Sequence, residues 1–275
     1  MPNRKTRYWT HLALIAVCIF MACPALYALQ VATLTVEQAF DVPPRLFPPS
    51  NDFFENARTL FNTQDFDRLL WNTITVAAVT VITKTALAML AGLAFVYYHF
   101  PGKIFLFFLV LLTLLMPTEI ILVPLFNLVA DLEWGAKHPK LALTVPFLAT
   151  ATGVFLFRQH FSNIPRELVE AAQMDGASPL RFLFSVLLPM SWNVIGAHVV
   201  IQFIYMWHQY AWPLFVVEPG EQLIQVGVRN AATSGSQTDF GLLMTAGVIA
   251  SLPPLILFLL LQRQFMNGFA LTRDK

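Results

Sequence analysis

Six long apolar blocks, almost free of charged side chains, dominate this 275-residue chain. They cover about residues 11–34, 73–98, 104–128, 141–157, 194–217 and 241–261. A helix of about 20 mostly apolar residues spans a bilayer core, and backbone amides facing lipid must be satisfied within their own segment. We therefore predict an all-α, polytopic membrane protein, with six transmembrane helices in one transmembrane domain over residues 1–275.

The composition agrees with this prediction. Charged residues make up 12% of the chain, about half the share in soluble domains. The net charge of +1 and the absence of a Lys/Arg cluster give no reason to expect a nucleic-acid partner. Cys18 and Cys23 show no metal-ligand spacing, so no metal site is expected.

The first block has two interpretations. Basic residues at its start and small residues near Ala25 and Ala28 are also found in cleaved signal peptides. The apolar run is long for a signal peptide and continues past Pro24 to about Leu34. We therefore expect a retained membrane anchor.

The distribution of Lys and Arg predicts the orientation. With the N-terminus in the cytoplasm, the inner segments hold ten basic residues: Arg4, Lys5, Arg7, Lys103, Arg158, Arg166, Arg181, Arg263, Arg273 and Lys275. The outer segments hold six: Arg45, Arg58, Arg68, Lys137, Lys140 and Arg229. Both termini are therefore expected inside. The long outer segments 35–72 and 218–240 are either solvated connectors or places where a soluble partner docks.

The inner segment 162–190 has the pattern of a helix, a turn and a second helix. Ser162 or Asn163 can cap the first helix, with Pro165 in its first turn, and the helix should run to about Met174. Gly176 then supplies the freedom that ends a helix and turns the chain.

A second helix should begin after this turn. Ser178 followed by Pro179 predicts its start, and Pro189 should kink or break it before the next span. On the first helix, Leu168, Ala171 and Ala172 share one face at helical spacing. Small side chains there would let another protein approach closely, as when a helix docks in a groove.

The run EAAQMDGASPLRFLFSVLLP over residues 170–189 resembles the EAA loop of permeases in bacterial ATP-binding-cassette importers. The matching positions are Glu170, Ala171, Ala172, Asp175, Gly176, Leu187, Leu188 and Pro189. Elsewhere, FPGK at 100–103, MPTE at 116–119, FLFRQ at 155–159 and WHQYAWPL at 207–214 resemble the carbohydrate-uptake type, which serves maltose and glycerol-3-phosphate. The likeness is greater to the second permease subunit of the glycerol-3-phosphate system. One departure is His208, where the family often has Asn after Trp.

The resemblance implies a permease subunit of the bacterial inner membrane, paired with a second permease. Two ATP-binding-cassette ATPase subunits and an extracytoplasmic substrate-binding protein would complete the importer. It further implies that Leu168, Glu170, Ala171, Ala172, Asp175, Gly176 and Pro189 couple the chain to the ATPase. The chain has no GxxxxGK[ST] segment. We therefore expect no cofactor here, with ATP and Mg²⁺ used by the partner ATPase.

Polar residues inside the apolar blocks are candidates for the substrate pathway. Lys84 and Glu119 lie within the second and third blocks and either pair with each other or meet the substrate. In the fifth block, successive polar residues are four, three, four and three positions apart, and this spacing predicts that they share one helix face. They are His198, Gln202, Tyr205, Gln209 and Trp212. Such side chains could bind a polyhydroxylated solute. Alternatively, they could form interhelical hydrogen bonds with the partner permease. His208 lies off this face and is expected at the membrane interface.

The expected cargo is glycerol-3-phosphate or a glycerophosphodiester, with a different sugar or an oligosaccharide as the alternative. Two other classes remain open at this point. A multi-span enzyme would need a carboxylate pair or a His/Asp cluster, and the sequence has no HExxH motif. An ion-coupled secondary transporter would need internal repeats and several intramembrane acids, and Glu119 is the one candidate.

Overall fold

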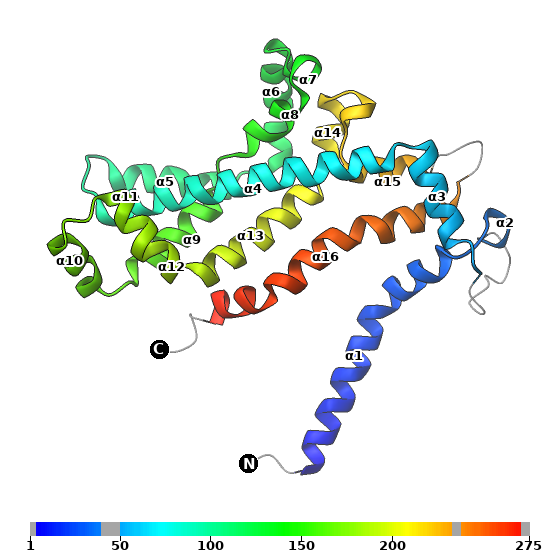
Figure 1. Cartoon of the computed structure of the whole chain (residues 1–275), viewed down its shortest axis with the longest axis horizontal. Coiled ribbons are helices and arrows are strands. Elements are labelled where there is room, and N and C mark those ends of the chain that lie inside the picture. The colour runs from blue at the N-terminus through cyan, green and yellow to red at the C-terminus, as the bar shows by residue number, and fades with distance from the viewer. Residues whose placement is uncertain (1–3, 40–49, 233–237, 271–275) are drawn as a thin grey trace. The chain divides into compact units, whose positions relative to one another are not determined.

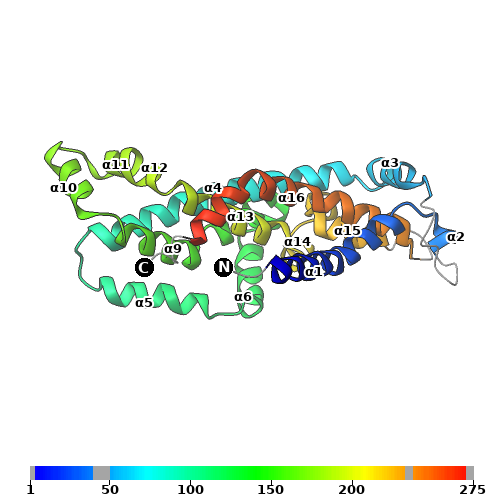
Figure 2. The same cartoon turned by 90° about the horizontal axis from the view of Figure 1, so that it is seen from below.

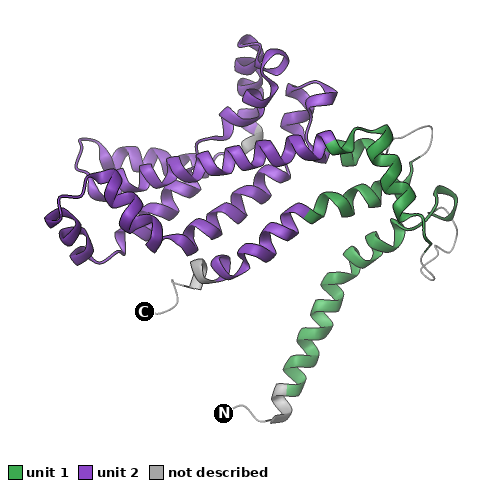
Figure 3. Cartoon of the chain, viewed as in Figure 1, with its two compact units in different colours: residues 1–67, 226–252 green, residues 68–225, 253–275 purple. Residues whose placement is uncertain are grey.

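The computed structural model describes residues 4–39, 50–232 and 238–270, with side chains over 8–39, 50–117, 120–231 and 238–266. Every regular element in these ranges is a helix, which confirms the all-α prediction for the described part of the chain. The chain divides into two compact units (Figure 3). The first unit comprises residues 1–67 and 226–252, and the second comprises residues 68–225 and 253–275.

The first unit contains the long apolar helix α1 (Arg4–Val31) and the elements near its C-terminal end (Figure 1). Its other elements are α2 (Val36–Ala39), α3 (Phe53–Thr63), most of α15 (Ile224–Ala232) and the beginning of α16 (Phe240–Ala270). Asn56 of α3 donates to the carbonyls of Ala32 and Leu34, at 3.1 and 3.2 Å. Thr245 of α16 also donates to the Ala32 carbonyl, at 3.1 Å. These bonds fix the end of α1, since its last carbonyls have no partner within the helix.

The second unit holds almost all of the long helix α4 (Phe66–Tyr97) and most of the elements that follow it in the chain (Figure 1). They are α5 (Lys103–Leu114), α6 (Thr118–Asp131), α7 (Trp134–Lys137), α8 (Pro139–Thr144), η1 (Val145–Phe147), α9 (Ala151–Ser162), α10 (Arg166–Met174), α11 (Pro179–Phe182), η2 (Leu183–Leu187), α12 (Leu188–Met190), α13 (Trp192–Trp207), α14 (Ala211–Val216) and η3 (Pro219–Glu221). The end of α16 completes it.

Two apolar cores hold the second unit together. One joins the first half of α4 to α6, α8, α14 and the end of α13, and includes Val81, Leu143 and Trp212. The other joins the second half of α4 to α9, η2 and the start of α13, and includes Phe157 and Leu187. Between these cores lies the polar cluster described below.

Three helices are long and apolar enough to cross a membrane: Tyr8–Val31, Phe66–Tyr97 and Phe240–Met266. Two further candidates are bent pairs, Pro139–Phe147 with Ala151–Ser162 at 44° and Pro179–Met190 with Trp192–Trp207 at 81°. By length and composition the described residues thus offer three to five spans. The exact number of six stays a prediction.

The third apolar block is not the single helix expected from sequence. It forms α5 and α6, which run in different directions (Figure 2). The break falls at Pro117, whose backbone is extended at φ −60° and ψ 133°. Proline has no N–H to continue the helix and disfavours helical geometry in the residue before it.

The outer segments contain regular elements, and whether they are solvated connectors or a docking place for a partner stays a prediction. Segment 35–72 contains α2 and α3, and α4 begins inside it at Phe66. Segment 218–240 contains η3 and α15. Some of each segment, namely residues 40–49 and 233–237, lies outside the described residues.

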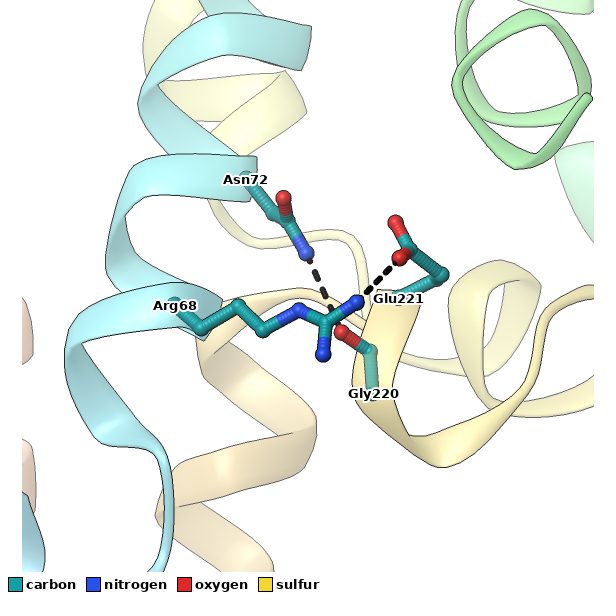
Figure 4. Close-up of polar contacts among 4 residues, drawn as sticks. All are labelled: Arg68, Asn72, Gly220 and Glu221. Carbon is teal, nitrogen blue, oxygen red and sulfur yellow. Dashed lines mark hydrogen bonds and ion pairs between the residues drawn. The ribbon is translucent and has the colours of Figure 1, made fainter. Parts of the chain in front are cut away.

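The start of α4 holds the chain that follows α14 (Figure 4). Arg68 pairs with Glu221 at 2.5 Å, and the Asn72 amide donates to the Gly220 carbonyl at 3.4 Å. The next residue of α4 is Thr73, whose hydroxyl accepts a 2.8 Å hydrogen bond from the Ile224 amide. Residues 220–224 are therefore fixed along two turns of α4.

Candidate functional site

A buried polar cluster joins three helices of the second unit near the middle of α4. The Lys84 ammonium donates to the side-chain oxygen of Gln202 on α13, at 2.8 Å. The Gln202 amide nitrogen donates to the hydroxyl of Thr150 at 3.4 Å. Thr150 is the N-cap of α9 and accepts from the Gly153 amide at 3.2 Å. The cluster thus links α4, α9 and α13 through side chains with partners on more than one helix.

The Lys84 side chain is only 4% exposed. A charged side chain at the bilayer centre costs about 2.5–3.5 kcal/mol on insertion scales, so its environment must compensate. Gln202 contributes an acceptor, and the face of the Tyr205 ring lies 5.0 Å from the ammonium nitrogen. A cation over an aromatic face gains about 2 kcal/mol when desolvated. Both contacts place electron-rich groups beside the Lys84 ammonium.

The Tyr205 ring connects this cluster to a pocket. The pocket has a volume of about 240 Å³ and lies between α6, η1, α13 and α14. Its polar lining side chains are Tyr205, Gln209 and Trp212, and Leu122, Leu125 and Phe147 form much of the apolar wall. Aromatic and amide groups of this kind bind polar solutes by stacking and hydrogen bonding.

His198 is part of the same region but faces protein. Its side chain is buried, and its ring lies 5.5 Å from that of Phe157. A Cβ atom added at Gly153 would lie 2.7 Å from the His198 ring, so α9 and α13 approach closely here. The Nε2 atom of His198 has no hydrogen-bond partner in the described structure.

The prediction of one continuous face for the five polar residues of the fifth block is wrong. Helix α13 ends at Trp207 and α14 begins at Ala211, so Gln209 lies in the turn between them. Trp212 is buried in the first core, where its ring nitrogen donates to the Ala142 carbonyl at 3.0 Å. The break separates Gln209 and Trp212 from the helix that carries His198, Gln202 and Tyr205.

Two other candidates occupy different positions. His208 is exposed at the C-cap of α13, where its Nδ1 lies 2.8 Å from the Ile204 carbonyl oxygen. The side chain of Glu119 lies outside the described residues, so its suggested pairing with Lys84 stays untested.

Thr150 is a residue of the cluster that the sequence analysis did not predict, although a threonine before an apolar helix is a common N-cap.

The inner segment contains α10, a turn and α11. Gly176 has φ +67°, a left-handed conformation that suits glycine. Ser178 caps α11 by accepting from the Arg181 amide at 3.4 Å. The prediction that Ser162 or Asn163 caps the first helix is wrong, because α10 begins after Pro165. Ser162 and Asn163 instead donate to the Gln159 carbonyl at the end of α9.

Helix α10 has one inward and one outward side. Val169 and Ala172 pack on the second core, whereas Leu168, Ala171 and Glu170 are exposed. The predicted common face of Leu168, Ala171 and Ala172 is therefore divided. Ala172 also lines a pocket of about 210 Å³ with Tyr97 and Phe182. The exposed side, continued by Asp175 and by Met174 at 88% exposure, is available to another protein.

A π-helical turn separates this region from α13. Residues 183–187 form η2, and Pro189 follows in α12. Pro189 cannot donate the backbone bond that the preceding turn would require. The Ser191 hydroxyl donates to the Leu187 carbonyl at 2.5 Å, and the chain bends by 81° before α13. The segment therefore has a defined bend at its junction with α13.

No group of three His, Cys, Asp or Glu side chains that could hold a metal ion occurs in the described structure.

Comparisons with known proteins place these features in context. The family model described as "Binding-protein-dependent transport system inner membrane component" matches residues 84–269. The sn-glycerol-3-phosphate transport system permease protein UgpE of Brucella melitensis is 35% identical over 271 residues, covering 95% of each chain. The protein of the same name from Pectobacterium atrosepticum is 35% identical over 274 residues, covering 97% of this chain and 96% of its own.

Two solved structures have a similar fold. A chain from a bacterial ABC transporter involved in the import of the acidic polysaccharide alginate aligns with a TM-score of 0.80 at 19% identity, covering 96% of this chain and 99% of its own. A chain from the alginate transporter in complex with an alginate pentasaccharide-bound periplasmic protein aligns with a TM-score of 0.66 at 17% identity, covering 94% of both.

Proposed function

The chain belongs to the family of binding-protein-dependent transport system inner membrane components, and we propose that it carries glycerol-3-phosphate or a glycerophosphodiester. It is a membrane transport subunit of an importer, not an enzyme. The observation that supports the cargo is the name shared by relatives 35% identical over at least 95% of this chain.

The alternative cargo is a sugar or an oligosaccharide. The solved structure with a TM-score of 0.80 comes from an importer of an acidic polysaccharide, although at 19% identity the likeness concerns the fold. Phosphate esters and acidic polysaccharides share polyhydroxylated carbon and negative charge. The pocket at Tyr205 and Gln209 suits the first property, and the charge is considered in the next subsection.

In our proposal the pathway runs past α13. Tyr205, Gln209 and Trp212 contact the solute from the pocket wall, while Lys84, Gln202 and His198 lie behind them. Glu119 belongs to the same proposal because of its place in the apolar sequence of the third block. A second permease would supply the opposite wall.

We further propose that α10 docks on an ATPase subunit. The exposed positions Leu168, Glu170, Ala171 and Asp175 form the contact surface, and Gly176 and Pro189 set the bends that transmit its movement. ATP binding in the ATPase would then bias a two-state element that opens the pathway to one side or the other. ATP and Mg²⁺ are used in that partner.

The orientation follows from the same proposal. Docking of α10 on an ATPase requires segment 162–190 in the cytoplasm. The excess of Lys and Arg in the inner segments supports this arrangement, with both termini inside. The outer segment fixed by Arg68, Asn72 and Thr73 then faces the extracytoplasmic binding protein.

The test is uptake by the complete importer in proteoliposomes. Labelled sn-glycerol-3-phosphate, glycerophosphocholine and maltose are supplied with the binding protein outside and ATP inside. The proposal predicts ATP-dependent uptake of the phosphate esters over maltose. Uptake of maltose alone would establish the alternative cargo.

A further inference from the structure

The Lys84 ammonium has fewer hydrogen-bond partners than it can use. An ammonium carries three N–H donors, and the described structure gives Lys84 one acceptor, the Gln202 side-chain oxygen. Lys103, the first residue of α5, instead donates to two backbone carbonyls, those of Val96 and Tyr98. Lys84 thus retains hydrogen-bonding capacity for another acceptor.

Among the described side chains, no negative charge lies beside Lys84. No described carboxylate lies within 4 Å of its nitrogen, and the pocket beside it is lined by no Asp or Glu. The neighbours Gln202 and Tyr205 are neutral groups that stabilise the positive charge without cancelling it.

The N-terminus of α9 adds positive electrostatic potential beside Lys84. Gln202 bonds to Thr150 at the N-cap of α9, a helix of 12 residues, and helix N-termini carry partial positive charge. In the same cluster, the Nε2 atom of His198 is buried without a partner. The Lys84 ammonium and the N-terminus of α9 therefore bring positive potential to one region of the second unit.

This positive region is coupled to the pocket through Tyr205. The ring whose face lies 5.0 Å from the ammonium is itself part of the pocket wall. Charges inside a low-dielectric region interact more strongly than in water. The field of Lys84 therefore reaches a solute in the pocket across one aromatic ring.

We propose that Lys84 makes the pathway selective for anionic solutes. Phosphate monoesters would then be favoured over solutes that are zwitterionic or neutral. Lys84 is a specificity-determining residue that acts beside the cargo rather than a link between helices alone. This inference rests on the proposed function, because it assumes that the pocket at Tyr205 lies on the pathway.

The first test compares two phosphate esters in the reconstituted importer. sn-Glycerol-3-phosphate carries close to two negative charges at neutral pH, whereas glycerophosphocholine carries no net charge. The variants are Lys84→Gln, which removes the charge, and Lys84→Arg, which keeps it. Lys140→Gln is the matched control, since it removes one exposed lysine from an outer segment.

Lys84→Gln should lower the ratio of glycerol-3-phosphate to glycerophosphocholine uptake about tenfold, and Lys84→Arg and Lys140→Gln should keep it within about twofold. An unchanged ratio in Lys84→Gln would overturn the proposal. So would an equal loss of both uptakes together with assembly, because that result assigns Lys84 a purely structural role.

A second measurement remains decisive if the wild-type importer carries neither ester, which would refute the proposed cargo but not the role of Lys84. Radiolabelled inorganic phosphate is bound to the detergent-solubilised complex without its binding protein. Binding about tenfold weaker in Lys84→Gln than in Lys84→Arg supports the proposal. Equal binding by the two variants contradicts it.

Discussion

Lys84 of α4 and Gln202 of α13 are joined by a 2.8 Å hydrogen bond, although 118 residues separate them in the chain. The bond lies between two apolar cores and continues through Thr150 to α9. It gives Gln202 a clear role between helices, whereas Gln209 lines the pocket. The two glutamines should therefore respond differently to substitution.

Gln202→Leu should destabilise the protein, because it removes the acceptor of a buried ammonium. Hydrogen bonds between membrane helices contribute about 0.6 kcal/mol on average and up to about 1.7 kcal/mol, and a charged donor favours the upper end. Gln209→Leu should leave stability within about 0.5 kcal/mol and reduce uptake. Thermal unfolding of the purified complex and proteoliposome uptake separate the two effects. Equal loss of assembly in both variants would argue against a pathway role for Gln209.

Gly153→Ala should disturb the contact of α9 with α4 and α13. The added Cβ would lie 2.7 Å from His198 and 2.8 Å from Ala88, and overpacking of this kind costs about 1–3 kcal/mol. Gly247→Ala is the control, because nothing lies within 4 Å of its Cβ position. A lower unfolding temperature for the first variant alone is expected. Equal temperatures would show that α9 can shift without cost.

Thr73→Val should loosen the outer segment more than Arg68→Ala does. The Thr73 hydroxyl is buried and serves the Ile224 amide, and a buried amide left without its acceptor costs about 1–3 kcal/mol. Arg68 and Glu221 form an exposed ion pair, worth about 0–1 kcal/mol. Amide hydrogen exchange at residues 222–226 measures the difference. Faster exchange in Arg68→Ala than in Thr73→Val would reverse this ranking.

Gly176→Val should weaken coupling to the ATPase. Its φ of +67° is strained for a β-branched residue, and the space around it is open. The free-energy cost of placing valine there therefore comes from backbone geometry alone and is about 1–2 kcal/mol. Gly176→Asn is the control, since asparagine tolerates this conformation better. Stimulation of ATPase activity by the loaded binding protein should fall in the valine variant more than in the asparagine variant. Identical stimulation in both would exclude a need for this turn.

Some features of the structure followed directly from local sequence. The end of α10 near Met174, the left-handed Gly176 and the Ser178 cap depend on residues within one or two turns of each other. The apolar blocks predicted a helical membrane protein because lipid permits few alternatives. These features needed no information about tertiary contacts.

Other features depend on contacts between distant segments. The break between α13 and α14 separates Gln209 from Gln202, although their spacing alone fits one helix. Trp212 is fixed by the Ala142 carbonyl and Lys84 by Gln202, 70 and 118 residues apart. The spacing of residues along a helix carries no information about such distant partners. The row of polar residues could therefore be recognised from sequence, but the break between α13 and α14 that divides it could not.

We propose that this chain moves its cargo only when a separate ATPase drives it through the segment around Glu170. The most direct measurement is uptake of labelled sn-glycerol-3-phosphate by proteoliposomes containing both permeases and the ATPase, with wild-type chain or Glu170→Arg. We expect uptake that requires ATP, the ATPase and the binding protein, and that falls at least tenfold in Glu170→Arg while the permease pair stays assembled. Uptake driven by an ion gradient without the ATPase, or undiminished uptake in Glu170→Arg, would contradict it.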